Sequence, residues 1–132
     1  MTRILVIDDD DSVRDILSKA LIDFGWQVRD ATDGEEGIEL LKDNGQYKVV
    51  ITDICMPKKD GNDVAKYVKG SINLKDVLVV GVTGMIEKAE KELFDYLIPK
   101  PFKIMDIVQI IGKLENSKWT IPPQVSGASV AI

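Results

Sequence analysis

Short apolar, β-branched runs alternate along this chain with segments in which apolar residues recur at helical spacing. The runs are typical of strands and lie at residues 2–7, 27–31, 48–54, 77–82 and 96–99. Strands that alternate with helices form a parallel sheet with helices on both of its faces. We therefore predict an α/β fold with a single doubly wound sheet of five parallel strands.

The helical segments are delimited by their own start and stop residues. One is expected from Val13 to Phe24, with Ser12 as cap and Gly25 as the stop. Others are expected from about 33–36 to 44–45, at 62–69, and from Ile104 to Leu114. Beyond residue 115 the periodicity ends and two prolines follow at 122 and 123. We predict a domain at 1–115 and a flexible C-terminal tail at 116–132.

Composition excludes several kinds of site. The chain has no histidine, which rules out a Ser-His-Asp triad, a histidine-ligated metal and phosphate carried on its own histidine. Its one cysteine, Cys55, cannot form an internal disulfide, and no apolar run is long enough to span a membrane. The net charge of −5 offers no general attraction to nucleic acid. We therefore expect a cytoplasmic protein without membrane insertion.

Polar residues follow the apolar runs at the ends where a parallel sheet binds its ligands. Asp8 and Asp9 end the first strand, Asp53 lies near the end of the third, Thr83 ends the fourth and Lys100 ends the fifth. Carboxylates gathered in one place repel one another unless a cation holds them, and Mg²⁺ suits such oxygen ligands. A carboxylate can also act as a nucleophile toward phosphorus. These residues together predict a phosphoryl-transfer site that uses Mg²⁺.

Taken one at a time, these residues have ordinary explanations. The acids from Asp8 to Asp11 are also typical of a helix start, and Thr83 and Lys100 are common in strands and loops. Asp53 is harder to explain in this way, because it follows an apolar strand where a charge needs a partner or a function.

The strings ILVIDDDDSVR, VVITDICMPKKDG, VVGVTG and PKPF, in this order, resemble the response-regulator receiver domains of two-component signalling (the CheY-like superfamily). The resemblance covers about residues 2–115. It implies the flavodoxin-like strand order 2-1-3-4-5 and Mg²⁺ as cofactor, with Mn²⁺ as a possible substitute. The implied roles are phosphoacceptor for Asp53; cation ligands for Asp9, Asp53 and the backbone carbonyl of Cys55; a water-mediated cation contact for Asp8; and phosphoryl binding for Thr83 and Lys100.

The segment before Lys100 departs from the family pattern. Only 17 positions separate Thr83 from Lys100, so we predict a shortened or irregular fourth helix around residues 87–94. The family's switch aromatic would fall on Leu97, whereas Tyr96 lies one position earlier. A bulge at residues 98–99 would restore the register and make Tyr96 the switch aromatic. Tyr96 is equally consistent with an ordinary half-buried strand residue.

The implied function is a phosphoacceptor switch of a phosphorelay. The donor is expected to be a sensor histidine kinase or a phosphotransfer protein, and the output an unidentified protein partner. No separate substrate turnover is expected. Because no effector domain follows residue 115, we also predict no direct binding of nucleic acid.

Two alternatives remain open at this point. The acids at residues 8–11 loosely resemble the opening motif of haloacid-dehalogenase-like phosphatases, which would make Asp8 the nucleophile and require multiple turnover of a phosphate ester. The shortened segment after Thr83 favours instead a phosphorylation-independent interaction module, whose partner binding would not change in Asp53→Asn. The sequence does not identify the kinase, the target, the phosphoryl lifetime or the oligomeric state.

Overall fold

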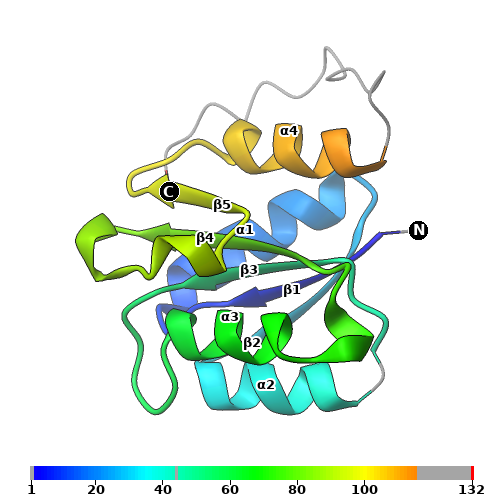
Figure 1. Ribbon diagram of the computed structural model, residues 1–132. Coiled ribbons are helices and arrows are strands. Elements are labelled where there is room, and N and C mark those ends of the chain that lie inside the picture. Colours follow the sequence, from blue (N-terminus) through cyan, green and yellow to red (C-terminus); the bar gives the residue numbers. More distant parts are fainter. Residues whose placement is uncertain (1, 44, 116–131) are drawn as a thin grey trace.

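Five parallel strands form one sheet in the order β2-β1-β3-β4-β5 (Figure 1). The computed structural model describes residues 2–43, 45–115 and 132. The strands are β1 Arg3–Ile7, β2 Gln27–Ala31, β3 Val49–Asp53, β4 Leu78–Thr83 and β5 Tyr96–Pro99, and the helices are α1 Asp11–Asp23, α2 Gly34–Lys42, α3 Gly61–Lys69 and α4 Ile104–Glu115. The predicted α/β class, the five strands and their order are confirmed.

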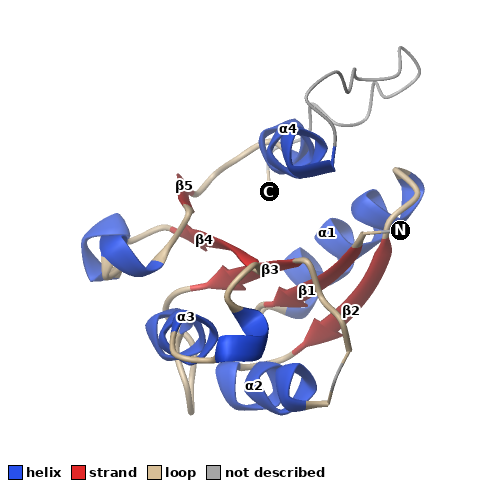
Figure 2. Cartoon of the chain, turned by 45° about the vertical axis from the view of Figure 1, so that its right-hand side comes forward, coloured by secondary structure: helices blue, strands red, loops and turns tan. Residues whose placement is uncertain are grey.

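Two apolar layers hold the helices against the sheet, and β3, buried along its whole length, lies in the middle. One layer joins α1 and α4 to the sheet, and the other joins α2 and α3 to its opposite face (Figures 1 and 2). Alternate residues of β3 serve both layers, since Ile51 belongs to the first and Val50 to the second. The sheet therefore has a fixed register, which aligns the carboxyl ends of its strands.

Aspartates cap the helices that begin near the carboxyl ends of the strands. Asp10 caps α1 by accepting hydrogen bonds from the backbone N–H groups of Ser12 and Val13, so the prediction that Ser12 is the cap is wrong. Asp33 caps α2, and Asp60 forms a capping box with Asp63 at the start of α3. These caps fix the loops through which the chain enters each helix.

The connection between β4 and β5 contains two short 3₁₀ turns, η2 Ile86–Lys88 and η3 Lys91–Leu93, in the segment where the sequence predicts a shortened or irregular helix. The prediction of a shortened or irregular helix is therefore confirmed. Asn62 of α3 holds the connection by donating to the Lys88 carbonyl over 2.9 Å and accepting from the Glu90 N–H over 2.8 Å. β5 pairs with β4 through four consecutive residues, from Tyr96 to Pro99, so the bulge expected at residues 98–99 is wrong.

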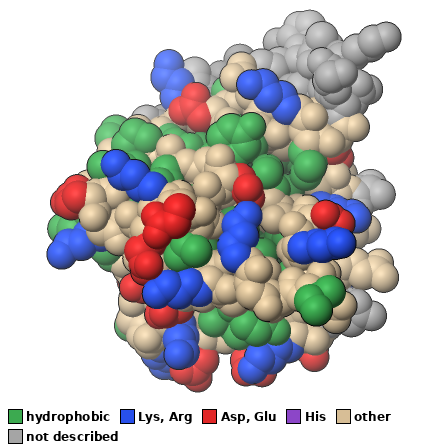
Figure 3. All heavy atoms as spheres, viewed as in Figure 1, with side chains coloured by type: hydrophobic (Ala, Val, Ile, Leu, Met, Phe, Trp, Pro, Cys, Tyr) green, Lys and Arg blue, Asp and Glu red, His purple; other side chains and the backbone are tan. Residues whose placement is uncertain are grey.

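The predicted flexible tail falls almost entirely outside the described residues. Ile132 alone is described, and its backbone exchanges two hydrogen bonds with Phe102, of 2.7 and 3.1 Å. Within the described part of the chain, no helix combines the length and apolar character needed to cross a bilayer. Acidic and basic side chains lie interspersed over the face shown in Figure 3.

Two neighbouring residues of α1 test how the apolar layer supports the sheet. Leu21 is fully buried in the layer shared with α4, whereas Ile22 is 52% exposed. We expect Leu21→Ala to lower the free energy of unfolding by about 2–5 kcal/mol, because it removes transfer energy and leaves a cavity. Ile22→Ala should change it by no more than about 0.5 kcal/mol. Urea denaturation of both variants measures the difference, and equal effects would contradict the layered core.

Candidate functional site

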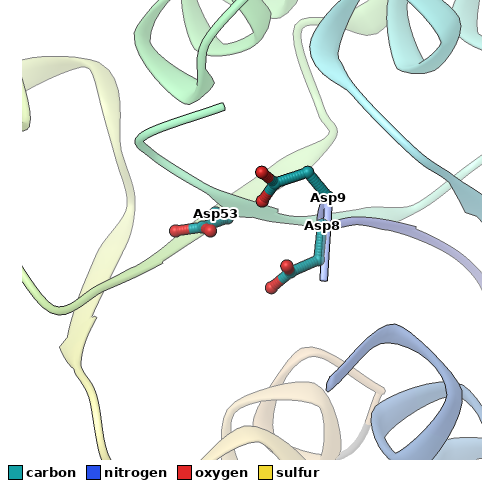
Figure 4. A group of neighbouring side chains, drawn as sticks. All are labelled: Asp8, Asp9 and Asp53. Atoms are coloured by element: carbon teal, nitrogen blue, oxygen red, sulfur yellow. The ribbon is translucent and has the colours of Figure 1, made fainter. Parts of the chain in front are cut away.

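Three carboxylates meet beyond the carboxyl ends of two adjacent strands. Asp8 and Asp9 directly follow β1, and Asp53 is the last residue of β3. Their side chains lie close together beyond these strand ends (Figure 4), and one oxygen of each lies within 4.8 Å of the others. Asp8 and Asp53 are buried, whereas Asp9 is exposed. The group thus opens to solvent on the side of Asp9.

Lys100 brings one positive charge to this group from the end of β5. Its Nζ lies 3.4 Å from Asp8 Oδ2 and 3.5 Å from Asp53 Oδ2, and its backbone N–H donates to the Thr83 carbonyl over 2.8 Å. Burial by itself lowers the pKa of Lys100, but the charges of Asp8 and Asp53 outweigh it and raise that pKa. Lys100 is therefore a fixed cation between two buried carboxylates.

Burial raises the pKa of both Asp8 and Asp53 above the usual value of an aspartate. For Asp53, the neighbouring charge of Asp8 raises the pKa further, while Lys100 opposes this effect. Each carboxylate also accepts one backbone hydrogen bond, Asp8 Oδ1 from Asp10 and Asp53 Oδ1 from Ile54, both over 2.8 Å. These bonds leave the Oδ2 atom of each carboxylate facing Lys100.

Thr83 is buried at the end of β4, next to Asp53 in the sheet. Asp53 is the register partner of Val82, so Thr83 lies one residue further along the neighbouring strand. Its Oγ1 accepts a hydrogen bond of 3.0 Å from the N–H of Met85. This bond uses a lone pair of the hydroxyl and leaves its proton available to an acceptor at the site.

The loop after β3 places Cys55 and Gly61 beside the acids. Cys55 is exposed two residues after Asp53. The N–H of Gly61 donates to the Ile54 carbonyl over 2.8 Å, and a Cβ at Gly61 would overlap the carbonyl oxygen of Asp53. Glycine is therefore needed where α3 begins, because any side chain there would displace the backbone of Asp53.

Tyr96 lies away from the carboxylates, at the start of β5. It pairs with Val80, three residues before Thr83, which corresponds to about 10 Å along the strand. Its side chain is 40% exposed. The structure thus places Asp8, Asp9, Asp53, Thr83 and Lys100 at one edge and Tyr96 toward the other end of β5.

The acid cluster has the donor set that a hard divalent cation prefers. Three carboxylate oxygens converge, and among the residues that the structure describes a single ammonium, that of Lys100, contacts Asp8 and Asp53. Three negative charges against one positive charge leave the site in need of a further cation, and Mg²⁺ binds through a few carboxylates while keeping several waters. The residues therefore fit Mg²⁺.

Two residues near the site were not singled out from the sequence. Arg14 contacts the Asp8 carbonyl, and Asn62 holds the connection after Thr83. Arg14 stands three residues after Asp11, at ion-pair spacing on a helix, which is a weak signal that could have identified it. Asn62 reads in the sequence as an ordinary polar residue of a helix start, so only the structure identifies its contacts.

Comparison with known proteins assigns the family. Residues 4–112 match the response regulator receiver domain. The chain is also similar to the solved structure of the response regulator TrrA from Thermotoga maritima in complex with Mg(2+)-BeF, with a TM-score of 0.77 and 29% identity over 86% of this chain and 99% of that one. The resemblance seen in the sequence motifs is thus confirmed.

Curated relatives correct one prediction about partners. The response regulator MprA of Mycolicibacterium vanbaalenii is 31% identical over 98% of this chain, which spans 56% of that protein. The DNA-binding transcriptional regulator NtrC of Azospirillum brasilense is 31% identical over 86% of the chain and only 24% of its own length. The prediction of no direct binding of nucleic acid is wrong. It rested on the lack of an effector domain after residue 115, whereas NtrC is a DNA-binding transcriptional regulator in which the matching sequence is one part of a longer protein.

The crowding of the carboxylates makes stability depend on pH. Because the pKa of Asp53 is raised in the folded protein, folding favours its protonated form, and stability should fall as pH rises from its ordinary pKa through the raised one. At neutral pH without divalent cations, we expect Asp53→Asn to raise the free energy of unfolding, because it removes a buried charge that the neighbouring Asp8 repels.

This gain should shrink when Mg²⁺ is added, because the cation stabilises only the wild-type site. Urea denaturation at several pH values, with and without Mg²⁺, measures both effects. Asp76→Asn, an exposed acid in the loop before β4, is the control. A loss of stability in metal-free Asp53→Asn would contradict the conclusion that burial and the charge of Asp8 make the ionised Asp53 unfavourable.

Proposed function

The chain belongs to the response regulator receiver domain family, and from this premise we propose that Asp53 accepts a phosphoryl group from a phosphohistidine donor in a Mg²⁺-dependent reaction. The observation that carries the proposal is the position of Lys100 Nζ, within 3.5 Å of one oxygen of both Asp8 and Asp53. A phosphoryl group on Asp53 would bring its oxygens to this ammonium. Because these 132 residues contain no histidine, the donor must lie outside them, as a phosphohistidine or a small acyl phosphate.

Asp9, Asp53 and the backbone carbonyl of Cys55 would hold Mg²⁺ directly, and Asp8 would hold it through water. The bound cation supplies positive charge that neutralises the oxygens of the transferring phosphoryl group. Mn²⁺ should substitute, because it accepts the same oxygen ligands. The Mg(2+)-BeF complex of the related TrrA supports this assignment.

The side chains of Asp53, Lys100 and Thr83 have separate roles in the reaction. Asp53 attacks phosphorus through Oδ2, because Oδ1 is bound to the Ile54 N–H; the new O–P bond forms as the bond to the donor nitrogen breaks. Lys100 stabilises the charge on the phosphoryl oxygens, and the Thr83 hydroxyl donates a hydrogen bond to one of them. Phosphorylation therefore changes the contacts of Thr83 and Lys100, which end the two strands flanking the 3₁₀ connection.

The chain then acts as a switch without turning over a separate substrate. The added charge of about −1.5 to −2 biases the position of Thr83 and of the connection that follows it. A partner reads this change. The exposed position of Tyr96 on β5 keeps it a candidate for that surface, although it lies far from Asp53 along the strand.

The two alternatives fit the site less well. A phosphatase with Asp8 as nucleophile requires an accessible carboxylate, but the side chain of Asp8 is only 2% exposed, compared with 12% for that of Asp53. A phosphorylation-independent module does not require Asp53 and Lys100 to keep this arrangement. Both alternatives remain outcomes of the experiments below.

We expect the protein to gain one phosphoryl mass when incubated with acetyl phosphate and Mg²⁺, as measured by intact mass spectrometry. The gain should be absent in Asp53→Asn and retained in Asp76→Asn. Chelation of the divalent cation should abolish it in the wild type, and Mn²⁺ should restore it. A gain that persists in Asp53→Asn, or multiple turnover of a phosphate ester abolished only by Asp8→Asn, would refute the proposal.

Lys100→Gln should slow phosphorylation by about 100-fold, because the fixed positive charge at the phosphoryl oxygens is lost. The same variant should bind Mg²⁺ more tightly than the wild type, because a cation that competes for Asp8 and Asp53 is removed. Lys103→Gln, an exposed lysine three residues further on, is the matched control. Rates from intact mass and Mg²⁺ affinity from calorimetry test both effects, and an unchanged rate in Lys100→Gln would remove Lys100 from the mechanism.

A further inference from the structure

The backbone that carries Asp8 and Asp9 is held by a side chain that lies outside the acid cluster. Arg14, in the first turn of α1, donates through Nη1 to the carbonyl oxygen of Asp8 over 2.8 Å. We propose that Arg14 is a positioning residue for the divalent cation, and that it acts by fixing the peptide between Asp8 and Asp9. This inference rests on the proposed function, in which these two acids hold Mg²⁺.

Arg14 is itself anchored from two directions. Its Nη2 lies 2.5 Å from Asp11 Oδ1 on the same helix, and its Nε lies 3.8 Å from Asp30 Oδ2 on β2. Its side chain is only 14% exposed. The planar guanidinium can meet several partners at once in a fixed geometry, which an ammonium cannot do. Arg14 therefore ties the loop after β1 to both α1 and β2.

The hydrogen bond from Arg14 to the Asp8 carbonyl restrains the backbone orientation of the next residue, Asp9. The N–H of Asp8 is bound to the Ala31 carbonyl over 3.2 Å, so with Arg14 both sides of this residue's backbone are fixed. Because a peptide unit is planar, fixing the Asp8 carbonyl also fixes the plane that leads to the Cα of Asp9. Asp9, the exposed acid of the cluster, is thereby aimed toward Asp53.

The same contacts give the four consecutive acids at residues 8–11 different roles. Asp10 is occupied as the cap of α1, and Asp11 is paired with Arg14. The carboxylates of Asp8 and Asp9 are left to face Asp53. Arg14 thus helps to decide which acids of a uniform run form the cation site.

Charge and position predict opposite effects of removing Arg14. A nearby positive charge opposes the binding of a cation, so on charge alone its removal would tighten Mg²⁺ binding. Loss of a group that orients metal ligands weakens binding, typically by 10–100-fold. A purely structural role as an i,i+3 partner of Asp11 would leave the affinity unchanged, because such pairs contribute only a few tenths of a kcal/mol to the helix. The direction of the change therefore identifies the role.

The experiment measures Mg²⁺ affinity of the full chain by calorimetry in the wild type, Arg14→Gln, Arg14→Lys and Lys19→Gln. Lys19 carries an exposed positive charge on the same helix, paired with Asp15, and controls for charge alone. We expect Arg14→Gln to raise the dissociation constant about tenfold, Arg14→Lys to raise it several-fold, and Lys19→Gln to leave it unchanged or slightly lower. Urea denaturation without Mg²⁺ verifies that each variant is folded.

An affinity in folded Arg14→Gln that equals or exceeds that of the wild type overturns the proposal, as does an equal weakening in Lys19→Gln. If Arg14→Gln does not fold, Arg14→Lys decides, and wild-type affinity in that variant overturns the proposal. A wild-type chain that binds no Mg²⁺ overturns both this inference and the proposed function. Wild-type binding with unchanged affinity in Arg14→Gln removes only the role of Arg14.

Discussion

The layered core confines three carboxylates and one ammonium at the carboxyl end of a parallel sheet, and the properties of the site follow from this confinement. Asp8 and Asp53 are buried there, and burial and mutual repulsion make their charges costly. Lys100 offsets part of this cost. The remaining imbalance of three carboxylates against one ammonium favours a small divalent cation, which would supply the positive charge that the protein leaves uncompensated. The apolar layers on both faces of the sheet fix the positions of the ends of β1, β3, β4 and β5. They thereby hold the carboxylates together although these repel one another.

Much of this arrangement was predictable from local patterns. The strands and their order followed from β-branched runs and family motifs, and the site from polar residues at strand ends. The cap of α1 was assigned to Ser12 rather than Asp10, because in an unbroken run of acids the sequence does not show which one turns back to the helix. The contacts of Arg14 with the Asp8 carbonyl and of Asn62 with the Lys88 carbonyl were not predictable for a related reason, because every residue carries such a backbone group.

The connection between β4 and β5 shows how a missing helix is replaced. Two 3₁₀ turns cover the space, and Leu93 and Phe94 pack on the layer shared by α2 and α3. Gly81 of β4 permits this, because a Cβ there would collide with Leu97 and Phe94. The spacing from Thr83 to Lys100 predicted the shortening. The regular pairing of β5 could not be foreseen, because it depends on how the shorter connection reaches the strand.

Asn62 links the connection between β4 and β5 to the first turn of α3. Its amide binds the backbone on both sides of Ala89, and it stands directly after Gly61, which contacts the backbone of Asp53. The loops that follow β3 and β4 are therefore braced against each other through the first turn of α3. A displacement of the connection must either break two hydrogen bonds or carry the start of α3 with it.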